Sequence, residues 1–319
     1  MIEAQGLTKR YGSTTAVADM SFTVEPGRVT GFLGPNGAGK STTMRMTVGL
    51  DAPTKGEVTV NGRRYVDHGA PLREIGVLLD AKAVHPGRTA RRHLTAMAAT
   101  HGISRTRVDE VIDIAGLASV ADKRVGGFSL GMGQRLGIAA ALLGDPQTLI
   151  LDEPVNGLDP EGVLWVRRLA RSLADQGRTV FLSSHLMAEM ALTADHVIVV
   201  GRGRVLADAP VSDLIAAAHG ERVRVASPHA ERLEAVLRSQ QATVVATGRD
   251  SLEVTGLSAA QVGDAAADAQ VALHELTAIA GSLEDAYLQL TAEDVEFRSA
   301  PMDTHETDAM ASQNEGGSR

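Results

Sequence analysis

The sequence predicts an α/β protein with a parallel sheet covered by helices on both sides, followed by a small α+β module. First, apolar strand candidates such as "TLILDEP", "RTVFLSSH" and "HVIVVGRGRVL" alternate with helix candidates such as "EGVLWVRRLARSLADQG". Second, a glycine-rich turn follows the strand candidate "VTGFL" and opens a helix. Third, after about Pro210 the pattern changes to short strands and helices in the order βαββαβ.

The first domain is expected to span residues 1–215. It begins with "SFTVEPGRVTGFLG", which predicts a strand, a turn and a buried strand, and "KSTTMRMTVGL" then predicts a helix. Residues 88–145 are expected to form a helical subdomain, because "TARRHLTAMAATHG" and "SRTRVDEVIDIAG" both have helical spacing. The strands and helices named above complete the domain.

A second domain is expected over residues 216–292. Strands at "ERVRVAS", "ATVVATG", "SLEVTG" and "VALHELT" alternate with helices, as in a ferredoxin-like module with one extra helix. Residues 293–319 are polar, acidic and poor in aliphatic side chains, so this tail is expected to be disordered.

The amino-acid composition restricts the classes of function that the chain can have. The formal net charge is −8, which disfavours a nucleic-acid partner, and the absence of cysteine excludes disulfides and thiolate metal sites. No uncharged apolar run approaches the roughly 18 residues of a spanning helix, and the first residues carry no apolar signal segment. A cytoplasmic protein that does not itself cross a membrane is expected.

The stretch "GPNGAGKST" is a candidate phosphate loop. Glycines allow backbone N–H groups to turn inward onto phosphate oxygens, and the helix start that follows favours an anion. Lys40 would reach the β- and γ-phosphates, and the Ser41 hydroxyl would bind Mg²⁺. The candidate nucleotide-binding residues here are Gly34, Pro35, Asn36, Gly37, Ala38, Gly39, Lys40, Ser41 and Thr42.

Two carboxylates stand where the strand candidate "TLIL" ends. Asp152 is placed to hold Mg²⁺ directly or through water, and Glu153 to orient or deprotonate an attacking water. Adjacent carboxylates suit hydrolysis better than transfer to a bulky acceptor.

These stretches together resemble the ATP-binding cassette (ABC) ATPases. The motifs "GPNGAGKST", "FSLGMGQR", "LDEP", "NGLD" and "FLSSH" have that family's order and spacing, over roughly residues 2–215. The resemblance implies a RecA-like core with a helical subdomain, and ATP and Mg²⁺ as cofactors. "YGSTTAVADMSF" and "LDEPVNGLDPEG" are similar to the ATPase subunits of bacterial multidrug and antibiotic exporters, whose membrane subunit is a separate chain.

The resemblance also implies roles for particular residues. In the chain's own site, Tyr11 would stack on adenine, Asp152 would bind Mg²⁺, Glu153 would polarise water and His185 would contact the γ-phosphate. Ser129 and Gly131 would bind the γ-phosphate of ATP held by a second subunit, and Asp159 would lie at the subunit contact. A homodimer would therefore enclose two ATP molecules, and a lone copy would have half of each site.

Two departures from the family pattern stand out. Asp80 stands where the family usually has a Gln that links Mg²⁺ to the membrane partner; a carboxylate keeps an oxygen ligand and loses the amide donor. Leu130 and Met132 replace the usual Gly and Gln of the signature, a variant associated with the exporter branch.

The function that follows is ATP hydrolysis coupled to export of a drug, antibiotic or other hydrophobic compound. The partner would be a polytopic membrane permease, which would hold the chain at the cytoplasmic face of the cell membrane. The alternatives are an ABC importer ATPase and a soluble non-transport ABC ATPase. A small-molecule kinase would leave "FSLGMGQR" and His185 unexplained.

Overall fold

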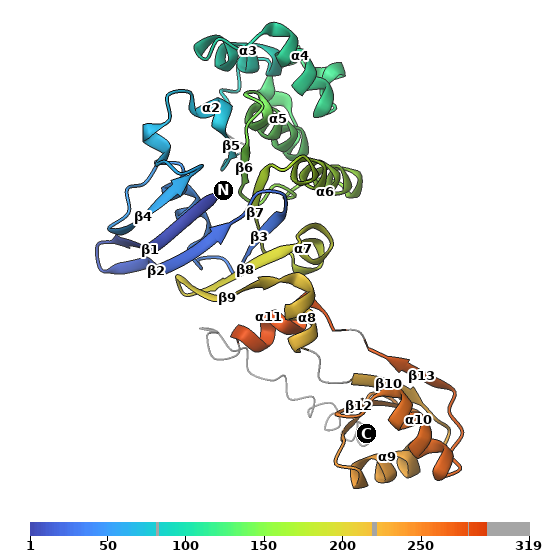
Figure 1. Ribbon diagram of the computed structural model, residues 1–319. Helices are drawn as coiled ribbons and strands as arrows, with labels where there is room; N and C mark the ends of the chain where they lie inside the picture. The colour runs from blue at the N-terminus through green and yellow to red at the C-terminus, as the bar shows by residue number, and fades with distance from the viewer. Residues whose placement is uncertain (81–82, 219–221, 280, 292–319) are drawn as a thin grey trace, which may run out of the picture.

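The first domain is built on a six-stranded sheet in the order β5-β6-β7-β3-β8-β9 (Figure 1). The computed structural model describes residues 1–80, 83–218, 222–279 and 281–291. The first five strands of this order are parallel and β9 is antiparallel. The strands are β3 (Val29–Leu33), β5 (Ile75–Leu78), β6 (Thr148–Leu151), β7 (Thr179–Ser184), β8 (His196–Gly201) and β9 (Arg204–Pro210). Every residue of β3, β6, β7 and β8 is buried, as expected for central strands covered on both sides.

The β8–β9 hairpin corrects one prediction. The sequence "HVIVVGRGRVL" predicts a single strand, whereas the structure turns the chain back at Arg202 and Gly203. Both residues have positive φ angles, of 44° and 76°, which is the conformation that a tight hairpin turn needs at its two central positions. The sheet therefore ends in an antiparallel edge strand.

A second, antiparallel sheet in the order β2-β1-β4 covers one side of the main sheet. Its strands are β1 (Ile2–Tyr11), β2 (Thr14–Val24) and β4 (Lys55–Val60). Phe22 of this sheet and Phe32 and Phe181 of the main sheet meet with ring centroids 5.1–5.9 Å apart. The strand patterns in the sequence do not distinguish this sheet from the parallel one.

The remaining regular elements of the first domain are mainly helices. The region expected to form a helical subdomain, residues 88–145, contains α3 (Ala90–Thr100), α4 (Arg105–Ile114) and α5 (Leu130–Leu142). The other helices of the first domain are α1 (Lys40–Thr47), α2 (Pro71–Glu74), α6 (Pro160–Asp175), α7 (Met187–Thr193) and α8 (Val211–Ala218).

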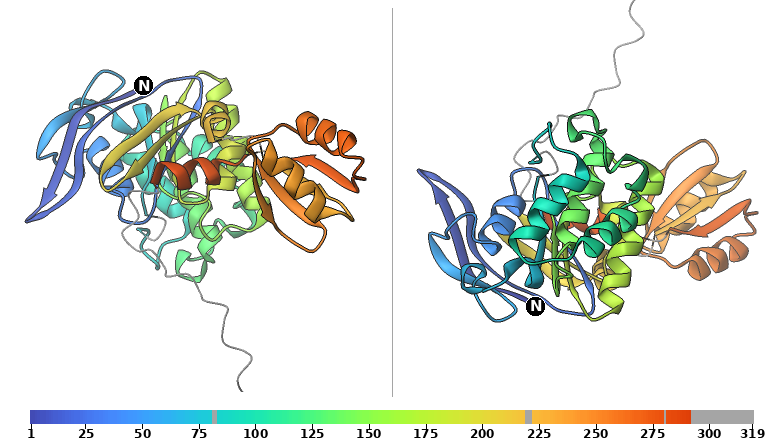
Figure 2. Two further views of the ribbon diagram at one scale, coloured as in Figure 1. Left: turned by 90° about the horizontal axis from the view of Figure 1, so that it is seen from below. Right: turned by 90° about the horizontal axis from the view of Figure 1, so that it is seen from above.

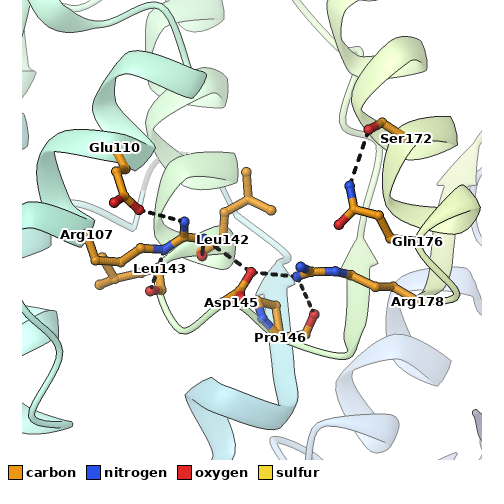
Figure 3. A network of polar contacts seen from close by, with 9 residues as sticks. All are labelled: Arg107, Glu110, Leu142, Leu143, Asp145, Pro146, Ser172, Gln176 and Arg178. Carbon is orange, nitrogen blue, oxygen red and sulfur yellow. Dashed lines mark hydrogen bonds and ion pairs between the residues drawn. The ribbon is translucent and has the colours of Figure 1, made fainter.

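A polar network attaches the helical subdomain to the core (Figure 3). Arg107 of α4 donates to the carbonyls of Leu142 and Leu143 at the end of α5, which satisfies acceptors that a helix end leaves open. Asp145 accepts from Arg178, just before β7, at 2.7 Å and lies 3.5 Å from Arg107. One carboxylate thus connects α4 to the start of a core strand.

The second domain has the ferredoxin-like strand order expected from sequence. Its antiparallel sheet runs β11-β12-β10-β13, and α9 and α10 pack on one face (Figure 1). The elements are β10 (Arg222–Ala226), α9 (Ala230–Ser239), β11 (Thr243–Ala246), β12 (Ser251–Thr255), α10 (Ala259–Asp268) and β13 (Glu275–Ala278). Figure 2 shows this domain projecting to one side of the first.

The last helix, α11 (Leu283–Thr291), corrects the expected domain boundary. Residues 216–292 are expected from the sequence to form the second domain, but α11 packs against α7, α8 and β9 (Figure 2, left). Leu283, Ala286 and Tyr287 are buried in the core of the first domain. The physical reason is that an amphipathic helix specifies a buried face without specifying the surface that covers it. The tail predicted to be disordered lies outside the described residues.

We expect Leu283→Ala to destabilise the first domain by about 3 kcal/mol, because it removes a buried leucine side chain. Leu288→Ala, on the same helix, is the matched control: Leu288 is 56% exposed and Leu283 2%. Denaturant unfolding followed by tryptophan fluorescence reports on this domain, since Trp165 in α6 is the chain's single tryptophan. Equal effects of the two substitutions would contradict the packing of α11 in this core.

Candidate functional site

The phosphate loop (residues 34–42) connects β3 to α1, and its shape depends on glycine. A Cβ on Gly34 would lie 2.4 Å from the carbonyl oxygen of Val200, and one on Gly39 would lie 2.6 Å from that of Ala16. Gly39 also has a φ of 98°, a conformation that residues with side chains rarely adopt. The loop thus enters α1 as the sequence predicts, with the helix's first N–H groups available to an anion.

Lys40 lies inside this loop, with 6% of its surface exposed. Its Nζ donates to the carbonyl oxygens of Gly34 at 2.6 Å and Pro35 at 3.2 Å. Burial lowers the pKa of Lys40, and the nearby carboxylates of Glu153 and Asp152 oppose that shift. The site therefore holds a partly desolvated cation, which strengthens its attraction for phosphate.

The neighbouring strand β7 orients the Asp152 carboxylate and holds the backbone of Glu153. The Ser183 hydroxyl donates to Asp152 Oδ1 at 2.5 Å and accepts from the Glu153 N–H at 2.9 Å. The Asp152 N–H donates to the Leu78 carbonyl of β5 at 2.7 Å. Because these are neighbouring parallel strands, their carboxyl ends meet at one edge of the sheet.

Glu153 has the most constrained position of the group. Its φ is 49°, in the left-handed region. Its Oε1 lies 3.8 Å from Lys40 Nζ and its Oε2 lies 2.8 Å from His185 Nδ1. The structure thus brings together Lys40, Asp152, Glu153 and His185, the residues expected to act on one nucleotide.

Tyr11 lies near the end of the phosphate loop and is 48% exposed. Its hydroxyl donates to Asp51 at 3.0 Å, and Arg45 holds the same carboxylate at 2.8 Å. Partial desolvation raises the pKa of Tyr11, the Asp51 bond raises it further, and the Thr42 hydroxyl opposes the shift. The ring is therefore anchored at its hydroxyl end, and Lys9 Nζ lies 5.0 Å from its centroid.

A separate group forms where the signature stretch (residues 128–135) meets the "NGLD" loop (residues 156–159). The side chains of Ser129 and Asp159 cap the starts of α5 and α6. A Cβ on Gly131 would lie 3.0 Å from the Gly157 carbonyl oxygen, so the two stretches pack closely. Within the described part of the chain, no hydrogen bond or ion pair joins Ser129, Gly131 or Asp159 to the phosphate loop.

Asp80 is exposed two residues beyond the end of β5. The last residue of that strand, Leu78, accepts from the Asp152 N–H. Asp80 is thus carried by the strand beside the acidic strand end, and a metal role for it stays a prediction.

Sequence reasoning missed two residues that contact this site, Ser183 and Gln134. Ser183 lies within the quoted "FLSSH", where a polar residue in a fully buried strand is the available signal. Gln134 is a buried amide on a helix whose other buried residues are apolar, and its Nε2 donates to the Glu153 carbonyl at 3.0 Å. Both contacts join residues far apart in the chain, so local patterns do not indicate them.

Neither a membrane-spanning helix nor a cluster of three or more acidic or histidine side chains suited to a metal occurs in the ranges that the structure describes. A metal at Asp152 would accordingly need further oxygens from a ligand and from water, which is how Mg²⁺ is commonly held beside phosphates.

Comparison with known proteins places these features in a family. A model described as "ABC transporter" matches residues 17–156, one for an AAA domain matches residues 124–191, and a domain of unknown function, DUF8746, matches residues 221–284. The chain is 44% identical over 217 residues to the bacitracin transport ATP-binding protein BcrA of Bacillus licheniformis, covering 67% of this chain and 71% of that protein. It is 33% identical over 301 residues to an uncharacterized ABC transporter ATP-binding protein of Bacillus subtilis, covering 92% and 96%.

Solved structures with a similar fold are also ABC ATPase subunits. An ATP-binding subunit of an ABC transporter superposes with a TM-score of 0.62 at 27% identity, covering 68% of this chain and 92% of that one. A dimeric ATP-binding cassette bound to ADP and phosphate, in a post-hydrolysis state, gives a TM-score of 0.60 at 24% identity and covers 66% and 98%. At that identity the second likeness establishes the fold alone.

Proposed function

We propose that this chain, which belongs to the ATP-binding subunits of ABC transporters, powers export of an antibiotic or similar hydrophobic compound through a separate membrane permease. ATP binding and ATP hydrolysis are properties of this family. The class of compound is supported by one observation above others, the 44% identity to a protein named for bacitracin transport. The direction is supported by 38% identity over 226 residues to a protein of Paraburkholderia xenovorans named for Nod factor export.

In this proposal the triphosphate lies on the phosphate loop, with Lys40 on its β- and γ-phosphates. Mg²⁺ would be held by the Ser41 hydroxyl and the Asp152 carboxylate, and the phosphates and water would supply its other oxygens. The bond from Ser183 supports this assignment, because it orients the Asp152 carboxylate while leaving oxygen lone pairs for a metal. Asp80 would contribute a further oxygen ligand.

Glu153 would polarise the attacking water. Its carboxylate already contacts His185 on one oxygen and approaches Lys40 with the other. An arriving γ-phosphate would compete with Glu153 for Lys40, which frees one carboxylate oxygen for the water. His185 would then keep the carboxylate in place and contact the γ-phosphate. Tyr11, anchored through Asp51, would stack on adenine.

The second group of residues requires a second copy of the chain. Ser129 lies exposed at the start of α5 and would bind the γ-phosphate of ATP held by the other copy. Asp159 would lie at the same contact. ATP would thus favour a closed dimer, because ADP lacks the phosphate that the second copy grips. The permease would hold the pair at the cytoplasmic face of the membrane and move with the dimer.

The transport proposal is tested with the chain expressed together with the polytopic membrane protein that we expect the adjacent gene to encode. Cells with both proteins should accumulate several-fold less fluorescently labelled bacitracin than cells in which the chain carries Glu153→Gln. The matched control is Glu161→Gln, which changes an exposed carboxylate in the first turn of α6 and should keep the export. ATP-dependent uptake in place of export would overturn the proposed direction.

A further inference from the structure

We propose that Gln134 is a positioning residue for ATP hydrolysis, which ties the signature helix α5 to the backbone of Glu153 and so fixes the carboxylate that activates water. This inference rests on the proposed function, because it assumes that Glu153 acts on the attacking water. The contact that it uses is with the Glu153 carbonyl oxygen.

Gln134 is unusual for its surroundings. It is 5% exposed, and its helix buries Leu136, Ile138 and Ala139 beside it. Burying a side-chain amide is unfavourable unless the amide finds a partner. Its partner is the Glu153 carbonyl oxygen, which accepts from Gln134 Nε2 at 3.0 Å.

The hydrogen bond from Gln134 is made to the backbone of Glu153, which has an unusual conformation. A φ of 49° is seldom adopted by a residue with a side chain, and it persists where surrounding contacts hold it. Three hydrogen bonds do so: the Glu153 N–H donates to Ser183 Oγ, and the Glu153 carbonyl accepts from Gln134 and, at 3.2 Å, from the Asn156 N–H. Of these three, the Gln134 bond comes from the helical subdomain.

Through Gln134, helix α5 connects Ser129, which would bind the other copy's ATP, to Glu153 in the chain's own site. Gln134 lies five residues after Ser129 on a continuous helical segment, a rise of roughly 7.5 Å. In the dimer, Ser129 would contact the other copy's ATP and Glu153 the chain's own ATP. A shift of α5 caused by one nucleotide would therefore reach the backbone of the residue that hydrolyses the other.

The first test is Gln134→Met, which keeps the length of the side chain and removes the donor. The Asn156 N–H still satisfies the Glu153 carbonyl, so the fold loses no essential bond. We expect kcat for ATP to fall about tenfold, with KM and the midpoint of thermal unfolding nearly unchanged. The matched control is Gln176→Met, since Gln176 is exposed and its amide donates to Ser172 at 3.4 Å.

A pH profile separates positioning from a structural role. In Gln134→Glu, a protonated carboxyl can donate to the same carbonyl and an ionised one cannot, and burial raises the pKa of such a group. The ratio of its kcat to that of the wild type should rise as the pH falls, while the ratio for Gln134→Met stays flat. Wild-type kcat in Gln134→Met would overturn the inference, as would flat ratios in both variants with losses that follow thermal stability.

The proposed function fails by a different result. A wild-type chain that hydrolyses ATP no faster than its Glu153→Gln variant would contradict the assignment of Glu153 itself, whatever the Gln134 variants do.

Discussion

Replacing Glu153 by glutamine is expected to lower the rate of ATP hydrolysis by about 10²–10⁴-fold, the range typical of losing a general base. Glutamine has the same size and can still hydrogen-bond to His185, but it carries no charge and accepts a proton from water poorly. ATP affinity should be maintained, because the phosphate loop and Lys40 are unchanged. Phosphate release under saturating ATP and Mg²⁺ measures the rate, and equilibrium binding of a fluorescent ATP analogue measures the affinity.

The comparison for this result is Glu161→Gln. Glu161 is an exposed acid in the first turn of α6, eight residues along the chain, and the same chemical change there should leave the rate within about twofold. Hydrolysis by Glu153→Gln at the wild-type rate would remove Glu153 from the reaction.

Replacing Lys40 by alanine is expected to weaken ATP binding by about 2–5 kcal/mol, the range typical of truncating one partner of a buried charge pair. The residue is buried, and its ammonium lies between loop carbonyls and the Glu153 carboxylate, where phosphate oxygens would take over its contacts. Hydrolysis should fall with binding. Titration with a fluorescent ATP analogue gives the affinity, and unchanged affinity would mean that nucleotide does not bind on this loop.

Lys40 also predicts a pH dependence. Burial lowers its pKa, so in the free protein it loses its proton at lower pH than an ordinary lysine. The protonated form binds phosphate, so ATP affinity of the wild type should decline as the pH rises through that lowered pKa. The decline should be absent from Lys40→Ala and present in Lys123→Ala, which changes an exposed lysine.

Local sequence patterns could predict those parts of the site that lie within one short segment of the chain. The phosphate loop needs glycines, a lysine and a helix start within nine residues, and the acidic strand end needs an apolar strand followed by two carboxylates. The contacts of Gln134 and Ser183 with Glu153 join residues 19 and 30 positions apart, and only the fold brings them together.

In the fold, too, local elements could be predicted from the sequence, and contacts between distant elements could not. Strand and helix periodicity predicted the helical subdomain and the ferredoxin-like order, because each element carries its own apolar pattern. Periodicity could not assign α11 to the first domain, since the same apolar face fits either core. It also missed the turn at Arg202 and Gly203, because arginine gives no local sign of a positive φ.

Two copies of the chain are expected to close on ATP, with Ser129 of each on the nucleotide of the other. Light scattering after size exclusion tests it on the Glu153→Gln protein, in which ATP should persist. With ATP and Mg²⁺ the mass should be about 67 kDa, twice the 33.4 kDa of one chain, and with ADP it should be 33.4 kDa. Adding Ser129→Arg should restore the single-chain mass in ATP. A single-chain mass at saturating ATP, or a dimer that forms equally with ADP, would contradict the account.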